Sequence, residues 1–204
     1  MKLRQVTFAA CAVLLLAGIS TAQDGMKPGD KPMSAEQKAM MDAWMKFATP
    51  AEGHKSLAGM VGTWDAEVTS WMDPAQPPEK SKGVSENRMM LGGRWVEQKF
   101  TSQMMGMPFE GLGYTGYDNH KKKYVGTWMD NMSTAVMVSE GTWDAAGRVM
   151  TSMATMDDFM TGKASQIKMV TTIMDPDHHM FEMWGPDPKG KNVKQMEIHY
   201  RRRK

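Results

Sequence analysis

Cysteine is almost absent from this chain, because Cys11 is its only one and lies close to the start. The absence excludes a disulfide framework, thiolate zinc sites and cysteine nucleophiles from everything that follows. Leucine and isoleucine are also scarce, with three of each after residue 22, whereas all but the first of the 25 methionines lie in that part. A packed core must therefore stabilise the protein, and methionine takes many places that leucine or isoleucine usually fills.

The chain also lacks a strong charge of either sign, since its formal net charge is +2. The protein therefore has no strong electrostatic field that would favour binding to nucleic acid or to an anionic membrane, and we expect no nucleic-acid partner. The basic tail at residues 200–204 is interpreted as a solvated chain terminus. No nucleophile elbow, HExxH zinc motif, phosphate-binding loop or CxxC pair occurs, so no motif by itself assigns an enzyme.

The first 22 residues have the pattern of a secretory signal peptide. Lys2 and Arg4 precede an apolar run over 6–19, which is too short to span a bilayer, and small residues lead up to Ala22. We expect cleavage after about Ala22, a secreted or periplasmic protein, and no stable membrane insertion afterwards. The alternative is a retained membrane anchor.

Residues 23–33 are rich in glycine and proline and predict a flexible leader. Residues 34–58 predict a short N-terminal helical segment. Ser34 with Gln37 three residues later is typical of a capping box, and apolar residues then recur at helical spacing up to Phe47. We expect this helix to pack its apolar face on the following domain, and a second short helix to start after Pro50.

Residues 59–71 contain the pattern on which the interpretation of the following residues is based. Gly62 and Trp64 form a Gly-x-Trp pattern that leads into a strand with Trp64, Ala66 and Val68 on one face. The glycine allows a tight turn, and the indole can close one end of a barrel.

Residues 59–204 then predict a barrel domain. Turn-forming residues separate ten alternating segments, and parallel pairing would need longer crossovers. The fold class is therefore all-β, an up-and-down antiparallel β-barrel of about ten strands, with a sandwich as the alternative. The predicted strands are 61–72, 82–91, 94–103, 109–117, 123–130, 134–143, 148–155, 164–174, 179–185 and 194–202.

A barrel of this size can hold one small ligand. Large aromatic and charged residues on the strands are therefore candidate ligand-binding residues, although register decides which of them face inward. The alternatives are that the charged residues face solvent and that each tryptophan is a core residue. The candidates are Trp64, Trp71, Arg88, Trp95, Trp128, Asp130 and Glu140.

Several motifs together resemble the bacterial family called domain of unknown function 1579. They include Gly62-Thr63-Trp64, Glu86-Asn87-Arg88, Leu91-Gly92-Gly93-Arg94, Gly116-Tyr117-Asp118-Asn119 and the run from Trp128 to Thr134. The resemblance covers roughly residues 33–203 and implies a calycin- or lipocalin-like barrel, without an activity or a catalytic set. The arginine that accompanies Gly-x-Trp in lipocalins is not assigned by the sequence.

We therefore expect a monomer or homodimer that binds an apolar or amphipathic small molecule without catalysis and without a cofactor. The first alternative is an extracytoplasmic Cu(I)-binding protein, because Met104, Met105 and Met107 cluster at a corner and thioethers suit soft ions. The second alternative is an enzyme in which His54, Asp130 or Glu140 meet inside the barrel.

Overall fold

The structure is a computed structural model that describes residues 32–71, 76–158, 161–187 and 189–204. The predicted signal peptide and most of the predicted leader lie outside the described residues. The chain divides into two compact units, Met1–Met41 and Asp42–Lys204. The second unit contains every strand of the described residues.

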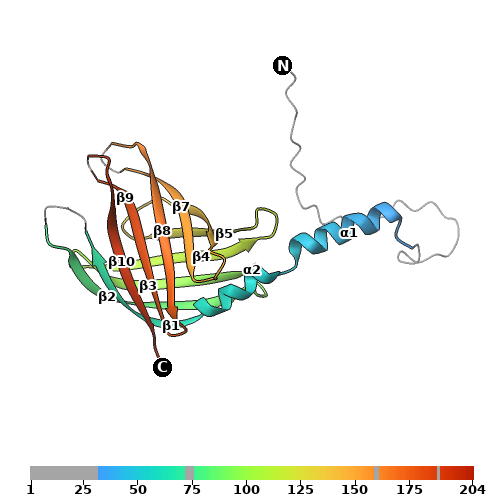
Figure 1. Cartoon of the computed structure of the whole chain (residues 1–204), viewed down its shortest axis with the longest axis horizontal. Coiled ribbons are helices and arrows are strands. Elements are labelled where there is room, and N and C mark those ends of the chain that lie inside the picture. Colours follow the sequence, from blue (N-terminus) through green and yellow to red (C-terminus); the bar gives the residue numbers. More distant parts are fainter. Residues whose placement is uncertain (1–31, 72–75, 159–160, 188) are drawn as a thin grey trace, which may run out of the picture. The chain divides into compact units, whose positions relative to one another are not determined.

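Ten strands close into one antiparallel barrel, in which each strand pairs with its sequence neighbours and β1 pairs with β10 (Figure 1). This confirms the predicted up-and-down barrel and removes the sandwich alternative. The strands are β1 Gly62–Ser70, β2 Glu79–Met90, β3 Trp95–Met104, β4 Met107–Asp118, β5 Lys123–Asp130, β6 Met137–Trp143, β7 Val149–Asp157, β8 Ala164–Asp175, β9 His178–Pro186 and β10 Asn192–Arg202.

Three short helical elements precede the barrel: α1 Ala35–Ala48, α2 Glu52–Lys55 and the 3-10 helix η1 Ser56–Met60. The predicted capping box is present, because Ser34 N–H donates to Gln37 Oε1 at 2.9 Å and Gln37 N–H donates to Ser34 Oγ at 3.1 Å. In the described part of the chain, no helix is long and apolar enough to cross a membrane.

The expected burial of the apolar face is wrong for the part of α1 that lies in the second unit. The helix has no buried residue, and Trp44 and Phe47 are 57% and 59% exposed. The last turn of α1 lies in the second unit and is held by side chains of the barrel loops. Arg94 donates to Ala48 O, and Asn119 Nδ2 donates to Phe47 O at 2.9 Å, so loop side chains satisfy carbonyls at the C-terminus of the helix.

η1 closes one end of the barrel. Leu57 is only 1% exposed and packs with Val96, Tyr124 and Met150, which come from three different strands. The Met60 carbonyl accepts hydrogen bonds from Trp64 Nε1 at 3.0 Å and from Asn87 at 2.9 Å. We call α2 and η1 the plug, and the strand halves away from it the distal half of the barrel.

Register assigns the inner and outer faces of the wall. Trp64 is the cross-strand partner of Ser85, which in turn faces Phe100, and cross-strand partners share a face. Trp64 and Phe100 both belong to the buried core cluster, so this row points inward. Positions two residues apart follow the same face, and the intervening residues, such as Asp65, point outward.

Two hairpins differ from their predictions. The expected two-residue turn at Gly92-Gly93 is a four-residue turn, because Met90 pairs with Trp95, and Leu91 adopts a φ of 48°. The expected longer corner around Met104–Pro108 is a tight turn, because Met104 pairs with Met107. Pro108 therefore lies within a strand, where only its missing N–H group limits pairing.

Candidate functional site

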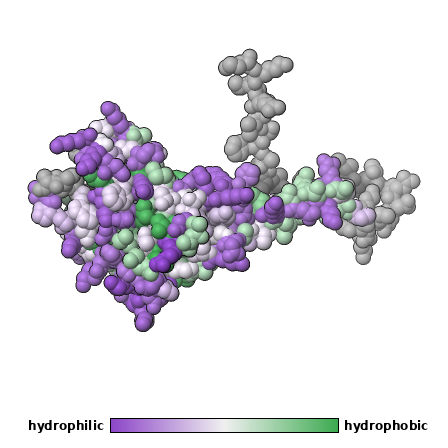
Figure 2. Space-filling view, in the orientation of Figure 1, coloured by the Kyte–Doolittle hydropathy of each residue, from purple (hydrophilic) through white to green (hydrophobic). Residues whose placement is uncertain are grey.

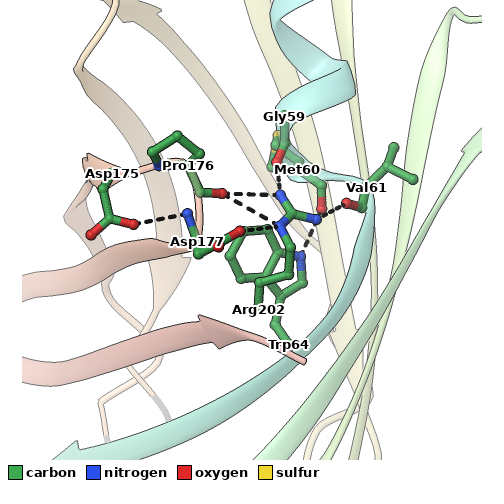
Figure 3. Close-up of polar contacts among 8 residues, drawn as sticks. All are labelled: Gly59, Met60, Val61, Trp64, Asp175, Pro176, Asp177 and Arg202. Atoms are coloured by element: carbon green, nitrogen blue, oxygen red, sulfur yellow. Dashed lines mark hydrogen bonds and ion pairs between the residues drawn. The ribbon is translucent and has the colours of Figure 1, made fainter. Parts of the chain in front are cut away.

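Arg202 fastens the plug to the closed end of the barrel (Figure 3). Its guanidinium lies 4.0 Å from the centre of the Trp64 ring and donates to Val61 O at 2.7 Å and Gly59 O at 3.1 Å. It also donates to Pro176 O, and it forms an ion pair with Asp177 at 3.1 Å. One side chain thus joins β10, the plug and the β8–β9 turn.

Gly62 makes room for this contact. It has a φ of 128°, and an added Cβ would lie 2.6 Å from an Arg202 guanidinium nitrogen. A side chain at position 62 would therefore be strained and would displace the guanidinium. Gly62, Trp64 and Arg202 form one structural unit, and the interpretation of the whole basic tail as solvated is wrong. Arg203 also forms an ion pair, with Asp65.

His179 lies on the inner face beside this unit. Its ring stacks on Tyr200 at 4.6 Å and meets Trp64 edge-on at 4.4 Å. Burial, helped by the charges of His178 and Arg202, lowers the pKa of His179 to about 4. Burial also raises the pKa of Tyr200 well above its usual value. Both groups are therefore neutral at pH 7.

Trp128 and Asp130 lie on the inner face of the distal half. Trp128 packs against the core cluster that contains Phe100, and its Nε1 donates to Asp130 Oδ2 at 3.0 Å. The β4 glycines Gly111 and Gly113 lie beneath the indole, and an added Cβ on Gly111 would overlap the ring. Glycine in β4 therefore allows Trp128 to lie flat along the wall.

Several apolar side chains on this inner face are only partly buried. They form a continuous surface, because Phe181 packs against both the core cluster that contains Phe100 and a second cluster that contains Ile167. A side chain on the inside of a closed barrel is exposed to its lumen, so these groups line solvent-accessible interior space. The partly buried inward-facing residues are Val68, Met104, Trp128, Met137, Phe181, Met183 and Met196.

A comparison with protein families identifies the family to which the chain belongs. Residues 49–202 match the family described as Protein of unknown function (DUF1579). The chain belongs to the DUF1579 family. The matched range begins in the segment before the plug and ends at Arg202. It therefore contains the barrel and the contacts of Arg202 with Trp64, the plug and the β8–β9 turn, which we call the Arg202 clamp. A comparison with curated proteins finds no match.

Solved structures show the same kind of fold. The crystal structure of Rv2717c from M. tuberculosis has a TM-score of 0.58 at 12% identity, over 76% of this chain and 100% of that one. A redesigned beta barrel matches with a TM-score of 0.38 at 13% identity, over 77% of this chain and 100% of that one. The second likeness is too weak to support an argument, and the first supports the barrel fold alone.

In this DUF1579 chain, three of the predicted ligand-binding residues lie on the outer wall. Arg88 forms an ion pair with Glu97, whose side chain is 6% exposed and also accepts from Tyr114 at 3.2 Å. Trp95 covers Gly116. Glu140 pairs with Lys121 and Lys123, which are about half exposed. The Arg88 pair holds the pKa of Glu97 below its usual value.

Trp71 also lies away from the lumen. Its ring is 5.9 Å from Lys194 Nζ, and Trp184 is 5.4 Å from the same atom. Lys194 pairs with Glu182 at 2.5 Å and Glu197 at 2.6 Å, so two carboxylates share its ammonium group. The seven predicted residues therefore do not form one site, since only Trp64, Trp128 and Asp130 face the interior.

The three methionines of the predicted Cu(I) site, Met104, Met105 and Met107, do not all lie on one face. Met104 and Met107 are cross-strand partners and share a face, and Met104 packs against the core. Met105 lies between them in the turn with a φ of 52° and is 67% exposed. Binding of Cu(I) at these residues stays a prediction. Among the described residues, no group of three or more His, Cys, Asp or Glu side chains could hold a metal ion.

The three residues of the enzyme alternative lie in different places. His54 is buried in the plug, where its Nδ1 accepts from Ala51 N–H at 3.0 Å, and burial lowers its pKa. Asp130 ends β5 at the opposite end of the barrel, and Glu140 faces outward. They do not meet in one cavity.

Two hollows mark the outer wall, which is mostly hydrophilic in the face shown in Figure 2. One of about 380 Å³ is lined by Lys99, Glu110 and Met129 and also by Asp130. The other, of about 650 Å³, is lined by Lys80, Lys82 and Arg203 and also by Glu79. Each hollow is therefore lined by residues of the inner face as well as by residues of the outer face, and the lumen itself is indicated by the partial exposure of its inner face.

Proposed function

We propose that the barrel binds a small apolar or amphipathic molecule in its distal half, without covalent chemistry. One observation carries the proposal: Trp128, Phe181 and four methionines point into a closed barrel and yet keep part of their surface exposed. In a filled core these side chains would be fully buried. Apolar surface that faces water inside a protein gains free energy when a ligand covers it.

The composition of this wall suits a ligand of variable shape. Aromatic rings contribute flat contact area, whereas methionine is unbranched and adapts its conformation to what it packs against. Met137 and Met183 pack with the same cluster, and Met196 belongs to the neighbouring one. The proposal therefore favours a family of related apolar ligands over a single rigid one.

The test is a titration with N-phenyl-1-naphthylamine, an uncharged probe whose fluorescence rises in apolar surroundings. Met137→Trp places a larger ring inside the lumen, and Val138→Trp adds a ring to the outer face, where Val138 is 59% exposed. We expect Met137→Trp to weaken binding by about tenfold or more, and Val138→Trp to leave the Kd unchanged. Absence of binding to the wild-type protein, or equal effects of the two variants, would overturn the proposal.

A further inference from the structure

The charged residues that face into the distal half of the barrel share one sign. On the described strands, the alternation of faces places two carboxylates there, Glu79 and Asp130, and no lysine or arginine. Glu79 is the partner of the buried inward residue Ser70, and Asp130 is the partner of Gly111, beneath the inward-facing Trp128. The inward-facing arginine, Arg202, lies at the closed end and is used by the plug.

Asp130 is held by hydrogen bonds but is not neutralised. Its Oδ2 accepts from Trp128 Nε1 at 3.0 Å, and its Oδ1 accepts from Met132 N–H at 3.0 Å. Both donors are uncharged, and Asp130 forms no ion pair with any described residue. Glu79 has a similar environment, since its Oε1 accepts from Met105 N–H at 2.9 Å.

Several carboxylates of the outer wall have a cationic partner. Glu97, Glu140, Glu182 and Glu197 each form an ion pair with a lysine or an arginine. A carboxylate that lacks such a partner and lies against an apolar interior keeps its attraction for a cation, because the surroundings screen charge less than water does. The face of an indole also attracts cations, and Trp128 adjoins Asp130.

We propose that the distal half of the barrel selects cationic amphiphiles, meaning molecules with an apolar body and an amine or quaternary ammonium head. The head lies at Asp130 beside the Trp128 ring, and the body lies along the aromatic and methionine wall. Glu79 adds to the negative potential from another part of the wall. An anionic head such as a carboxylate is repelled. The inference rests on the proposed function and adds the chemical class of the ligand.

The experiment compares three probes with the same ten-carbon chain: decyltrimethylammonium, decan-1-ol and decanoate. Each displaces N-phenyl-1-naphthylamine at pH 7.5, at concentrations below micelle formation. We expect decyltrimethylammonium to bind at least tenfold more tightly than decanoate, with decan-1-ol between them. Asp130→Asn should reduce that ratio to within about threefold.

Glu110→Gln is the matched control. It removes the same charge from the neighbouring strand β4, but register places Glu110 on the outer face. The preference for the ammonium probe should persist in this variant. A circular dichroism spectrum of each variant establishes that the barrel is folded.

The outcomes separate the two proposals. If decan-1-ol and the naphthylamine probe fail to bind, the proposed function fails. If decan-1-ol binds but decanoate matches or exceeds the ammonium probe, only the cationic preference is overturned, whatever the variants do. Should Asp130→Asn unfold, the wild-type ratio still decides, and Asp130→Glu is expected to keep the preference because it keeps the charge.

Discussion

His179 couples the interior of the barrel to pH. Its pKa is about 4 in the folded protein, against 6.5 for an unperturbed histidine, so the unfolded chain binds the proton more tightly. The contribution is fully present above about pH 6.5 and is lost progressively as the pH falls from 6.5 to 4. At pH 5, linkage with these two pKa values predicts a loss of about 2 kcal/mol in the free energy of unfolding.

His179→Phe tests this directly, because phenylalanine keeps the stacking on Tyr200 and cannot be protonated. We expect the free energy of unfolding of the wild type to fall between pH 7.5 and pH 5 by about 2 kcal/mol more than that of the variant. Urea denaturation at both pH values measures the difference. Equal losses in the two proteins would show that His179 is not the group responsible.

The role of Arg202 was not predicted from the sequence, although part of the information was present. A run of basic residues at a chain terminus is usually solvated, and this general rule led to the wrong prediction for Arg202. A signal was nevertheless present: a strand that reaches residue 202 places Arg202 on the same face as Tyr200, since strand faces alternate. The pairing of Arg202 with Trp64 joins the two ends of the barrel sequence, and no local pattern encodes such a contact.

At the scale of elements, the strands were predictable because alternation of apolar and polar residues together with turn residues carries most of the signal. β5 matches its predicted bounds, and the other strands differ by a few residues at their ends. The differences arise at turns. At Met105 and Leu91, non-glycine residues adopt a positive φ, which sequence reasoning does not expect.

The clamp made by Arg202 joins three elements, and its removal should affect them together. Arg202→Ala leaves the carbonyls of Gly59, Val61 and Pro176 without their donor and uncovers the Trp64 ring. We expect a loss of about 3 kcal/mol in the free energy of unfolding, measured by urea denaturation.

Arg201→Ala is the control for this prediction, because Arg201 is the next residue, carries the same charge and is exposed on the outer face. Its effect should stay within about 0.5 kcal/mol. A comparable loss in both variants would mean that general charge, and not the clamp, stabilises the closed end.

At the scale of the whole molecule, the sequence predicted the barrel but not its interior. Which face of each strand points inward depends on register and on barrel closure, and both follow from contacts between distant strands. Trp128 and Trp95 illustrate this. Both lie over glycines of β4, yet one faces the lumen and the other faces outward, according to the parity of the glycine beneath each ring.

We expect the barrel to need the plug for folding but not α1. α1 buries no residue, whereas Leu57 in the plug is 1% exposed and packs against residues of three strands. A chain that begins at Thr49 should therefore have a free energy of unfolding within about 2 kcal/mol of the full chain, because the described residues before Thr49 that lie in the second unit contribute hydrogen bonds from the end of α1 and no buried side chain.

A chain that begins at Gly62 lacks the plug. Loss of one buried leucine alone costs about 2 to 5 kcal/mol, and this truncation also removes the Met60 carbonyl and the partners of Arg202. We expect it to be unfolded at 25 °C or to lose more than about 5 kcal/mol, as measured by circular dichroism during urea denaturation. Native stability in this shorter chain would contradict a structural role for the plug, because the ten strands would then close without it.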